Sequence, residues 1–180
     1  MLNDTETKRL RFRLLETDDF ESWLPFFYSA EALRNVGMSD IKSPEAGCQE
    51  WIDKCLKRYA EDKGGMNVLI DKKTGHFIGQ CGLLIQEIEG ETLLEIGYSI
   101  LPAHRGKGYA TEAAQKCKDE AFEREFSNVL ISMVHIENDA SKQVILKNDM
   151  SFWKHIPYYK GHPVNIYRIT RESWMKLKNT

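Results

Sequence analysis

The first 65 residues alternate between strand-like and helix-like patterns of apolar positions. Residues 9–15 alternate apolar residues with arginines, which predicts a half-buried strand. Residues 20–28 carry apolar side chains at helical spacing, although Pro25 must kink or split that helix. A second helix is expected to begin after Ser43, because a serine hydroxyl accepts hydrogen bonds from the first helical N–H groups. We expect it to end at residues 64–65, where two glycines follow one another.

The rest of the chain predicts a meander of strands followed by alternating helices and strands. Small side chains on one face of a long helix would let that helix lie close to a sheet. We expect strands at 66–71, 76–86 and 93–100, a helix at 109–126, a strand at 129–136, a short helix at 141–147, and a hairpin of 150–157 with 164–170. About seven strands and about four helices predict an α/β (α+β mixed) fold, in a single domain over residues 1–180.

Composition and charge exclude several classes of protein. Hydrophobic residues make up 42% of the chain, and only 12 glycines and 5 prolines are present, which excludes a disordered, collagen-like or low-complexity protein. The 25 lysines and arginines balance 27 aspartates and glutamates to a net charge of −2. Because no run of basic residues could neutralise many phosphates, we expect no nucleic acid partner.

Neither the cysteines nor the histidines form a ligand pattern. The 4 cysteines contain no C-x-x-C pair, and the 5 histidines show no metal-ligand spacing, so no metal is expected. The first residues lack both the basic region and the apolar stretch of a signal peptide. No apolar segment reaches the roughly 20 residues that a membrane span requires. We therefore expect a cytoplasmic protein with no membrane partner.

Residues 94–113 carry the strongest chemical signal in the chain. A strand ends there in a glycine-rich basic loop that runs straight into a helix. The first N–H groups of a helix have no intrahelical partners, and the helix dipole adds positive charge to them, so this arrangement favours an anion. Gly106 and Gly108 let the backbone approach a phosphate, while Arg105 and Lys107 supply mobile cations.

Three phosphate-binding patterns compete for this loop. A Walker A loop requires Gly-Lys-Ser/Thr, but Lys107 is followed by Gly108. A dinucleotide fingerprint requires a glycine or alanine where Thr111 stands, and an acidic residue at the end of a second parallel strand that this chain does not provide. The third pattern, Arg/Gln-x-x-Gly-x-Gly/Ala, fits Arg105, Gly108 and Ala110.

With this loop and several further motifs, the chain resembles the GNAT superfamily of N-acetyltransferases. Within that superfamily it is similar to the branch typified by the RimJ/RimL ribosomal-protein N-terminal acetyltransferases. The resemblance covers nearly the whole chain, and the order and spacing of the motifs make it specific. The motifs are Thr7-Lys8-Arg9-Leu10-Arg11-Phe12-Arg13, Phe77-Ile78-Gly79, Glu95-Ile96-Gly97-Tyr98, the loop itself, Asn138-Asp139-Ala140-Ser141 and Lys147-Asn148-Asp149-Met150.

The resemblance implies a cleft that binds acetyl-CoA as cosubstrate. It implies a mixed sheet that splays open between the strand ending near Ile100 and the strand ending near Ile136. The pyrophosphate would rest on backbone N–H groups of the loop, and the pantetheine arm would pair with the main chain of the first of these strands. The cofactor-binding residues expected on this basis are Tyr98, Ile100, Leu101, Arg105, Gly106, Lys107, Gly108, Tyr109, Ala110, Asn138 and Lys147.

Glu95 is the best candidate for a general base, or for a carboxylate that orders a water acting as one. An ammonium has no lone pair to attack a thioester, so a proton must leave before or during the attack. In a strand, Glu95 shares a face with Gly97 and Ser99. The alternative is a solvated carboxylate on a half-exposed strand, and Glu87 could also reach the acceptor side.

The leaving group needs a different donor from the one that many members of the superfamily use. They carry a tyrosine four residues before a Gly-Phe pair, whereas this chain has Ile145 there and Asp149-Met150 in place of the pair. The RimJ/RimL branch tends to lack that tyrosine, which moves the catalytic assignment to Ser141 and Asn138. Both residues could equally be a loop asparagine and a helix cap. Asp149 tolerates a left-handed backbone better than most residues.

The resemblance implies an N-acetyltransferase that transfers the acetyl group directly to a primary amine in a ternary complex. A protein N-terminal α-amine is the expected acceptor, because its reference pKa of about 8 leaves a neutral fraction at pH 7. A small-molecule amine, such as a polyamine, amino acid or antibiotic, is the alternative. A non-catalytic acyl-CoA-binding sensor is a further one. Monomer and homodimer both remain open.

Overall fold

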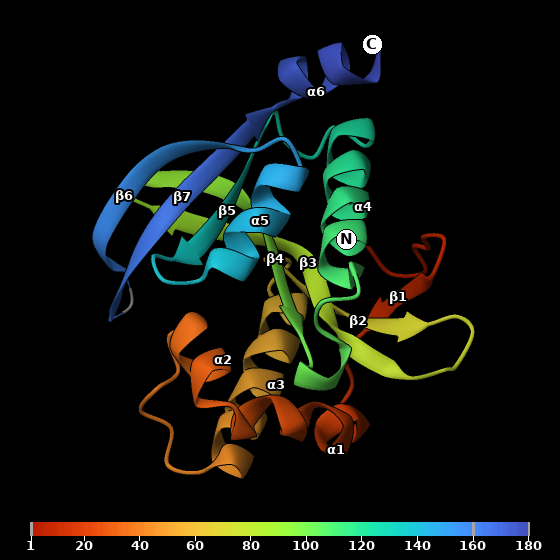
Figure 1. Cartoon of the computed structure of the whole chain (residues 1–180), viewed down its shortest axis with the longest axis vertical. Coiled ribbons are helices and arrows are strands. Elements are labelled where there is room, and N and C mark those ends of the chain that lie inside the picture. Colours follow the sequence, from red (N-terminus) through yellow and green to blue (C-terminus); the bar gives the residue numbers. More distant parts are fainter. Residues whose placement is uncertain (1, 160, 180) are drawn as a thin grey trace.

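The computed structural model describes residues 2–159 and 161–179, and its framework is a seven-stranded sheet with the order β1-β2-β3-β4-β5-β7-β6 (Figure 1). The strands are β1 (Leu10–Leu14), β2 (Gly64–Asp71), β3 (Phe77–Ile88), β4 (Glu91–Ile100), β5 (Val129–His135), β6 (Ser151–Tyr159) and β7 (His162–Thr170). The helices are α1 (Phe20–Trp23), α2 (Ala30–Asn35), α3 (Pro44–Ala60), α4 (Tyr109–Glu123), α5 (Asp139–Lys147) and α6 (Arg171–Lys178).

The sheet splits between its two halves. Strands β1 to β4 pair antiparallel in chain order, and β5, β7 and β6 form the second antiparallel set. The halves meet in a parallel pairing of β4 with β5 that covers only Leu94 with Leu130 and Glu95 with Ile131. Just beyond it, the Ser132 hydroxyl donates to the Ile96 carbonyl at 2.9 Å. This geometry confirms the expected mixed, splayed sheet.

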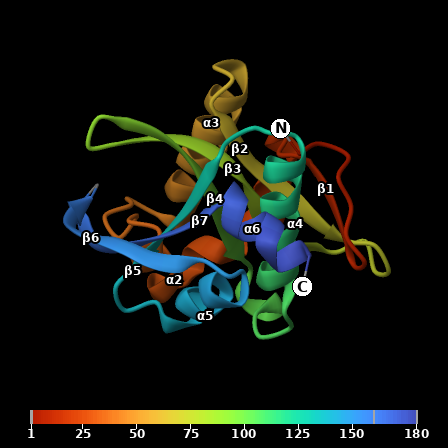
Figure 2. The ribbon, with the colours of Figure 1, turned by 90° about the horizontal axis from the view of Figure 1, so that it is seen from above.

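Two hydrophobic clusters hold helices on opposite faces of the first half-sheet. One includes the small residues of α4, which lie almost without exposed surface against β3 and β4. The other contains apolar residues of α1, α2 and α3 packed on β2. Figure 2 shows α3 and α4 on opposite sides of β2 and β3. The small residues of α4 are Ala113, Ala114, Cys117 and Ala121.

Several local predictions are confirmed. The helix expected around Pro25 divides into α1 and a 3₁₀ segment at Leu24–Tyr28. Ser43 caps α3, because its hydroxyl accepts a hydrogen bond from the Ala46 N–H at 3.2 Å. Asp149 has a φ of 62°, so it occupies the left-handed region as expected.

Other local predictions were wrong. Helix α3 ends at Ala60, and residues 64–65 belong to β2 instead of ending the helix. A Cβ atom on Gly64 would lie 2.1 Å from the Leu83 carbonyl oxygen, so this glycine permits the close approach of β2 to β3. The described residues also form six α-helices where about four were expected, since α2 and α6 were not predicted.

A buried lysine fastens α4 to the end of α5. The Lys118 ammonium donates to the Asn148 carbonyl at 2.9 Å and to an Asp149 carboxylate oxygen at 3.0 Å. Its side chain is only 5% exposed. A buried ammonium is costly unless it is paired and hydrogen-bonded, and both conditions are met here. The contact therefore fixes the position of α5 relative to α4.

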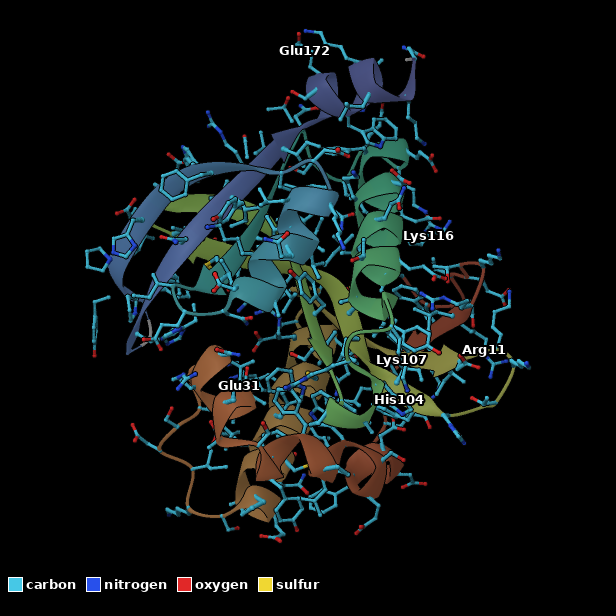
Figure 3. The ribbon with its side chains drawn as sticks, viewed as in Figure 1. Arg11, Glu31, His104, Lys107, Lys116 and Glu172 are labelled. Atoms are coloured by element: carbon cyan, nitrogen blue, oxygen red, sulfur yellow. The ribbon has the colours of Figure 1, made fainter. Side chains whose placement is uncertain are left out.

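Lys118→Met should reduce the free energy of unfolding by about 1–3 kcal/mol, because a buried carbonyl oxygen then loses its donor. Lys116→Met is the matched control on the same helix. Lys116 points outward (Figure 3) and pairs with Glu120 one turn away, so its loss should cost less than about 0.5 kcal/mol. Urea denaturation measures both values. Equal losses in the two variants would contradict the assigned role of Lys118.

Candidate active site

The loop between β4 and α4 has the backbone geometry of an anion site. Gly106 and Gly108 have φ values of 73° and 79°, in the left-handed region. Gly108 is the N-cap of α4, and no described side chain caps that helix. A Cβ atom on Gly106 would meet nothing within 4 Å, and one on Gly108 would meet only Arg9 at 3.5 Å. The positive φ angles, rather than crowding, therefore require these glycines.

Residues just before β1 fix the conformation of this loop. The Arg9 guanidinium donates to the Lys107 carbonyl at 2.8 Å and to the Glu112 carboxylate at 2.6 Å. The second Glu112 oxygen accepts from the Arg9 N–H at 2.9 Å and from the Thr7 hydroxyl at 2.5 Å. These bonds turn the Lys107 carbonyl toward β1. Sequence analysis did not predict these hydrogen bonds, because no local pattern relates Arg9 to Lys107 or Glu112, which are about 100 residues away in the chain.

A second anchor fixes the first residue of α4. The Tyr109 hydroxyl donates to an Asp71 carboxylate oxygen at 2.8 Å, and the Arg9 guanidinium lies over the Tyr109 ring at 4.4 Å. The hydrogen bond from Tyr109, together with bonds from Thr74 and Lys73, lowers the pKa of Asp71 to about 2. The turn between β2 and β3 thus supports the helix start.

Of the two basic residues of the loop, Arg105 lines the cleft between the half-sheets, whereas Lys107 does not. The Arg105 side chain donates to the Ile100 carbonyl at 3.2 Å and forms an ion pair with Glu31 of α2 at 3.7 Å. The exposed Lys107 donates to the Ala103 carbonyl at 3.0 Å. Figure 3 shows Glu31 on α2 and Lys107 in the loop before α4. Lys147 lines the same cleft from the last turn of α5.

The splayed sheet encloses a cleft of about 600 Å³. This volume lies within the range of roughly 300–1,000 Å³ that is typical of ligand sites. One end is lined by residues 104–106 and 108–111 of the β4–α4 loop and helix start, and by α5. The other end is lined by α2, α3 and residues of β6 and β7. The cleft therefore connects the α4 side of the molecule to the α3 side.

Alternate residues of β4 present their backbone to this cleft. The Ile96 carbonyl accepts from Ser132 of β5, so it points toward the second half-sheet. Backbone groups of alternate residues in a strand point the same way, which directs those of Tyr98 and Ile100 into the cleft. The Leu101 N–H instead donates to the Ile78 carbonyl at 3.0 Å, toward β3.

Glu95 lies at the last paired position before the strands separate. It lines the cleft on the α3 side, and its carboxylate accepts a hydrogen bond from the Gln86 amide of β3 at 2.6 Å. Burial, and then the nearby Glu95 carboxylate, raise the pKa of Tyr159 to about 12.

Glu87, the other candidate base, is exposed, and its carboxylate accepts from the Thr92 hydroxyl at 2.7 Å. Sequence analysis missed Gln86, whose position follows from the β3–β4 register.

Asn138 and Ser141 lie on the opposite side of β4 from Glu95. Asn138 is the N-cap of α5, because its side-chain oxygen accepts from the Ser141 N–H at 3.0 Å. The Ser141 hydroxyl lies 2.8 Å from the Tyr98 hydroxyl. Ile145, at the position where many family members carry a tyrosine, is buried and apolar. Since Asn138 caps the helix, the Ser141 hydroxyl is not needed for that purpose.

These features agree with the sequence family. The pattern of the family described as "Acetyltransferase (GNAT) domain" matches residues 9–151, so the chain belongs to the GNAT family and is an acetyl-CoA-dependent acetyltransferase. In Bacillus subtilis (strain 168), YkkB is 33% identical over 167 residues, covering 89% of this chain and 92% of that protein. The N-acetyltransferase YoaA of the same organism is 29% identical, covering 92% of this chain and 96% of YoaA.

Solved structures share the fold. An acetyltransferase from Agrobacterium tumefaciens str. C58 has a TM-score of 0.75 and 27% identity, covering 91% of this chain and 92% of that one. RimL, a ribosomal L7/L12 alpha-N-protein acetyltransferase solved with coenzyme A, has a TM-score of 0.72 and 14% identity. The match covers 93% of this chain and 97% of RimL. The likeness to RimL, at 14% identity, is one of fold alone.

Two further observations concern the described residues as a whole. None of the helices within 2–159 and 161–179 has the length and apolar character to cross a membrane. Within the same ranges, no cluster of three or more histidine, cysteine, aspartate or glutamate side chains could hold a metal ion.

Tyr109→Phe should raise the pKa of Asp71 from about 2 toward its ordinary value of 3.8. Because the folded-state pKa is depressed, this carboxylate stabilises the fold above pH about 4, and the contribution is lost as the pH falls toward 2. In Tyr109→Phe, the stability lost as the pH falls from about 4 toward 2 should be smaller than in the unchanged protein. NMR titration of the Asp71 carboxyl measures the shift, and Tyr28→Phe, at an exposed tyrosine, is the control. An unchanged pKa in Tyr109→Phe would assign the depression to the turn residues alone.

Proposed function

We propose that this protein transfers the acetyl group of acetyl-CoA directly to the N-terminal α-amine of a protein. The observation that carries the proposal is the separation of β4 from β5 immediately after Glu95. It opens a cleft with an anion-binding helix start at one end and a carboxylate on the other side of the strand. Acetyl-CoA whose pyrophosphate rests on that helix start would extend its thioester into the gap, beside the carboxylate.

The α4 end of the cleft would hold acetyl-CoA. Backbone N–H groups of residues 106–110 would bind the pyrophosphate, because the helix dipole and the left-handed glycines direct them to one point. Arg105, Lys107 and Lys147 would add positive charge around it. The backbone of Tyr98 and Ile100 would pair with the pantetheine arm as an added strand would, and the Asn138 amide would donate to the same arm.

Glu95 would take the proton that the amine loses. The neutral nitrogen attacks the thioester carbonyl carbon, a C–N bond forms, and the nitrogen proton passes to Glu95 directly or through a water. The hydrogen bond from Gln86 supports this role, because it fixes the direction of the carboxylate. As the C–S bond breaks, the sulfur gains negative charge, and the Ser141 hydroxyl would donate a hydrogen bond to it.

The charges of the acceptor end favour a singly charged amine. Glu50 and Glu95 supply carboxylates to its lining, and Lys54 and Arg58 supply cations. The Glu31 carboxylate pairs with Arg105 of the loop. A polyamine carries several positive charges and would favour a more acidic wall. The shared fold with RimL supports a protein N-terminus.

Acetyl-CoA turnover with a panel of acceptors tests the proposal. Short peptides with free N-termini should release coenzyme A thiol, while the same peptides with blocked N-termini and an internal lysine should not. Mass spectrometry locates the added acetyl group. Turnover with spermidine or amino acids alone would replace the protein acceptor by a small molecule. Acetyl-CoA binding without thiol release by any acceptor would indicate a sensor.

Arg105→Ala should weaken acetyl-CoA binding about 10- to 150-fold, the size of a hydrogen bond to a charged group. The loss should shrink as salt rises, because salt screens the interaction. Calorimetric titration measures Kd. Arg11→Ala is the control, since Arg11 is exposed on β1 and points away from the cleft (Figure 3). If Arg105→Ala binds as tightly as Arg11→Ala, Arg105 is a surface residue.

Glu95→Gln should lower kcat by about 10²- to 10⁴-fold while the Kd for acetyl-CoA changes little. The rate should recover in part at high pH, where solvent removes the proton from the amine. Glu87→Gln is the matched control, because that carboxylate is exposed near the turn of the same β3–β4 hairpin. Loss of activity in Glu87→Gln with full activity in Glu95→Gln would exchange the two roles.

A further inference from the structure

A pair of hydroxyl groups spans the cleft from β4 to α5. The Tyr98 hydroxyl lies 2.8 Å from the Ser141 hydroxyl and 3.0 Å from the Ser141 carbonyl oxygen. The tyrosine comes from the first half-sheet, whereas the serine follows the second. These contacts therefore link the two sides of the splayed sheet at the place where the thioester would lie.

The hydrogen atoms of this pair can be arranged in two ways. In the first, Tyr98 donates to the Ser141 carbonyl, and the serine hydroxyl donates to Tyr98. In the second, Tyr98 donates to the serine oxygen, and the serine proton is left to point elsewhere. Only the second arrangement leaves Ser141 a hydrogen for the sulfur, since a hydroxyl has one proton to donate.

We propose that Tyr98 is a positioning residue that donates to the Ser141 oxygen and so directs the serine proton toward the departing sulfur. This inference rests on the proposed function, in which Ser141 stabilises that sulfur. A hydroxyl that accepts a hydrogen bond becomes a stronger donor, because successive bonds polarise one another. The pair therefore favours the thiolate more than a serine alone would.

Tyr98 orients the serine but keeps its own proton. Burial raises the pKa of Tyr98, so a tyrosinate in this position is strongly disfavoured. The sulfur can leave as a thiolate held by the serine hydrogen bond, since a cysteine-like thiol has a reference pKa of only about 8.5. The thiolate takes its proton later from solvent. No proton needs to travel along the pair.

A double-mutant cycle on kcat tests the inference. Ser141→Ala should lower kcat about 10- to 100-fold, at the weak end for acid catalysis. Tyr98→Phe keeps the ring and backbone and should lower kcat by about 3- to 10-fold, the size of one neutral hydrogen bond. The double variant should match Ser141→Ala alone, because a residue that acts through Ser141 has no effect without it. KM for acetyl-CoA should stay the same in Tyr98→Phe.

A purely structural link between the two half-sheets would behave differently. Tyr98→Phe would then lower Tm or raise KM while leaving kcat unchanged. Alternatively, its effect on kcat would add to the effect of Ser141→Ala. Each of these results overturns the inference. Tyr28→Phe, at an exposed tyrosine bonded to Glu45, controls for loss of a hydroxyl and should leave kcat unchanged. If Ser141→Ala itself keeps full kcat, the proposed role of Ser141 fails and the inference with it. If only Tyr98→Phe keeps full kcat, the inference alone fails.

Discussion

The short parallel pairing between β4 and β5 is the constraint on which the cleft depends. The two half-sheets pair as strands over only two residue pairs, and β4 and β5 then diverge. A buried backbone group must find a hydrogen-bond partner, and strand separation turns the backbone of Tyr98 toward the cleft instead of a neighbouring strand. The Ile100 carbonyl there accepts from the Arg105 side chain. The Ser132 bond to the Ile96 carbonyl fixes where the separation begins. One local break in a continuous sheet thus creates a place for an extended arm.

The anion-binding loop is shaped by parts of the chain that are remote in sequence. Its two glycines permit the left-handed turns, but they do not select one loop conformation. Arg9 and Glu112 fix a carbonyl of the loop, and Asp71 fixes the first residue of α4. The N-terminal strand and the β2–β3 turn therefore hold the loop in place before any ligand binds, which reduces the entropy that binding must cost.

The proposed chemistry divides between the two faces of β4. Glu95 points to the α3 side, where an acceptor would enter, and Tyr98 points to the α5 side, where the sulfur would lie. Neighbouring residues of a strand alternate in direction, so residues three apart serve opposite faces. A base and a leaving-group donor can then act on one carbonyl from two sides without contacting each other.

The sequence by itself determined the strand pattern, the glycine-rich loop and the family, since each depends on residues close together or on motifs in a fixed order. It also contained caps for α2 and α6, at Ser29 and Thr170, that were not recognised as helix starts. Only the tertiary structure paired Gln86 with Glu95, Arg9 with Glu112, and Tyr98 with Ser141. Such pairs depend on strand register and helix docking, which arise from burial of the whole core and leave no local signal in the sequence.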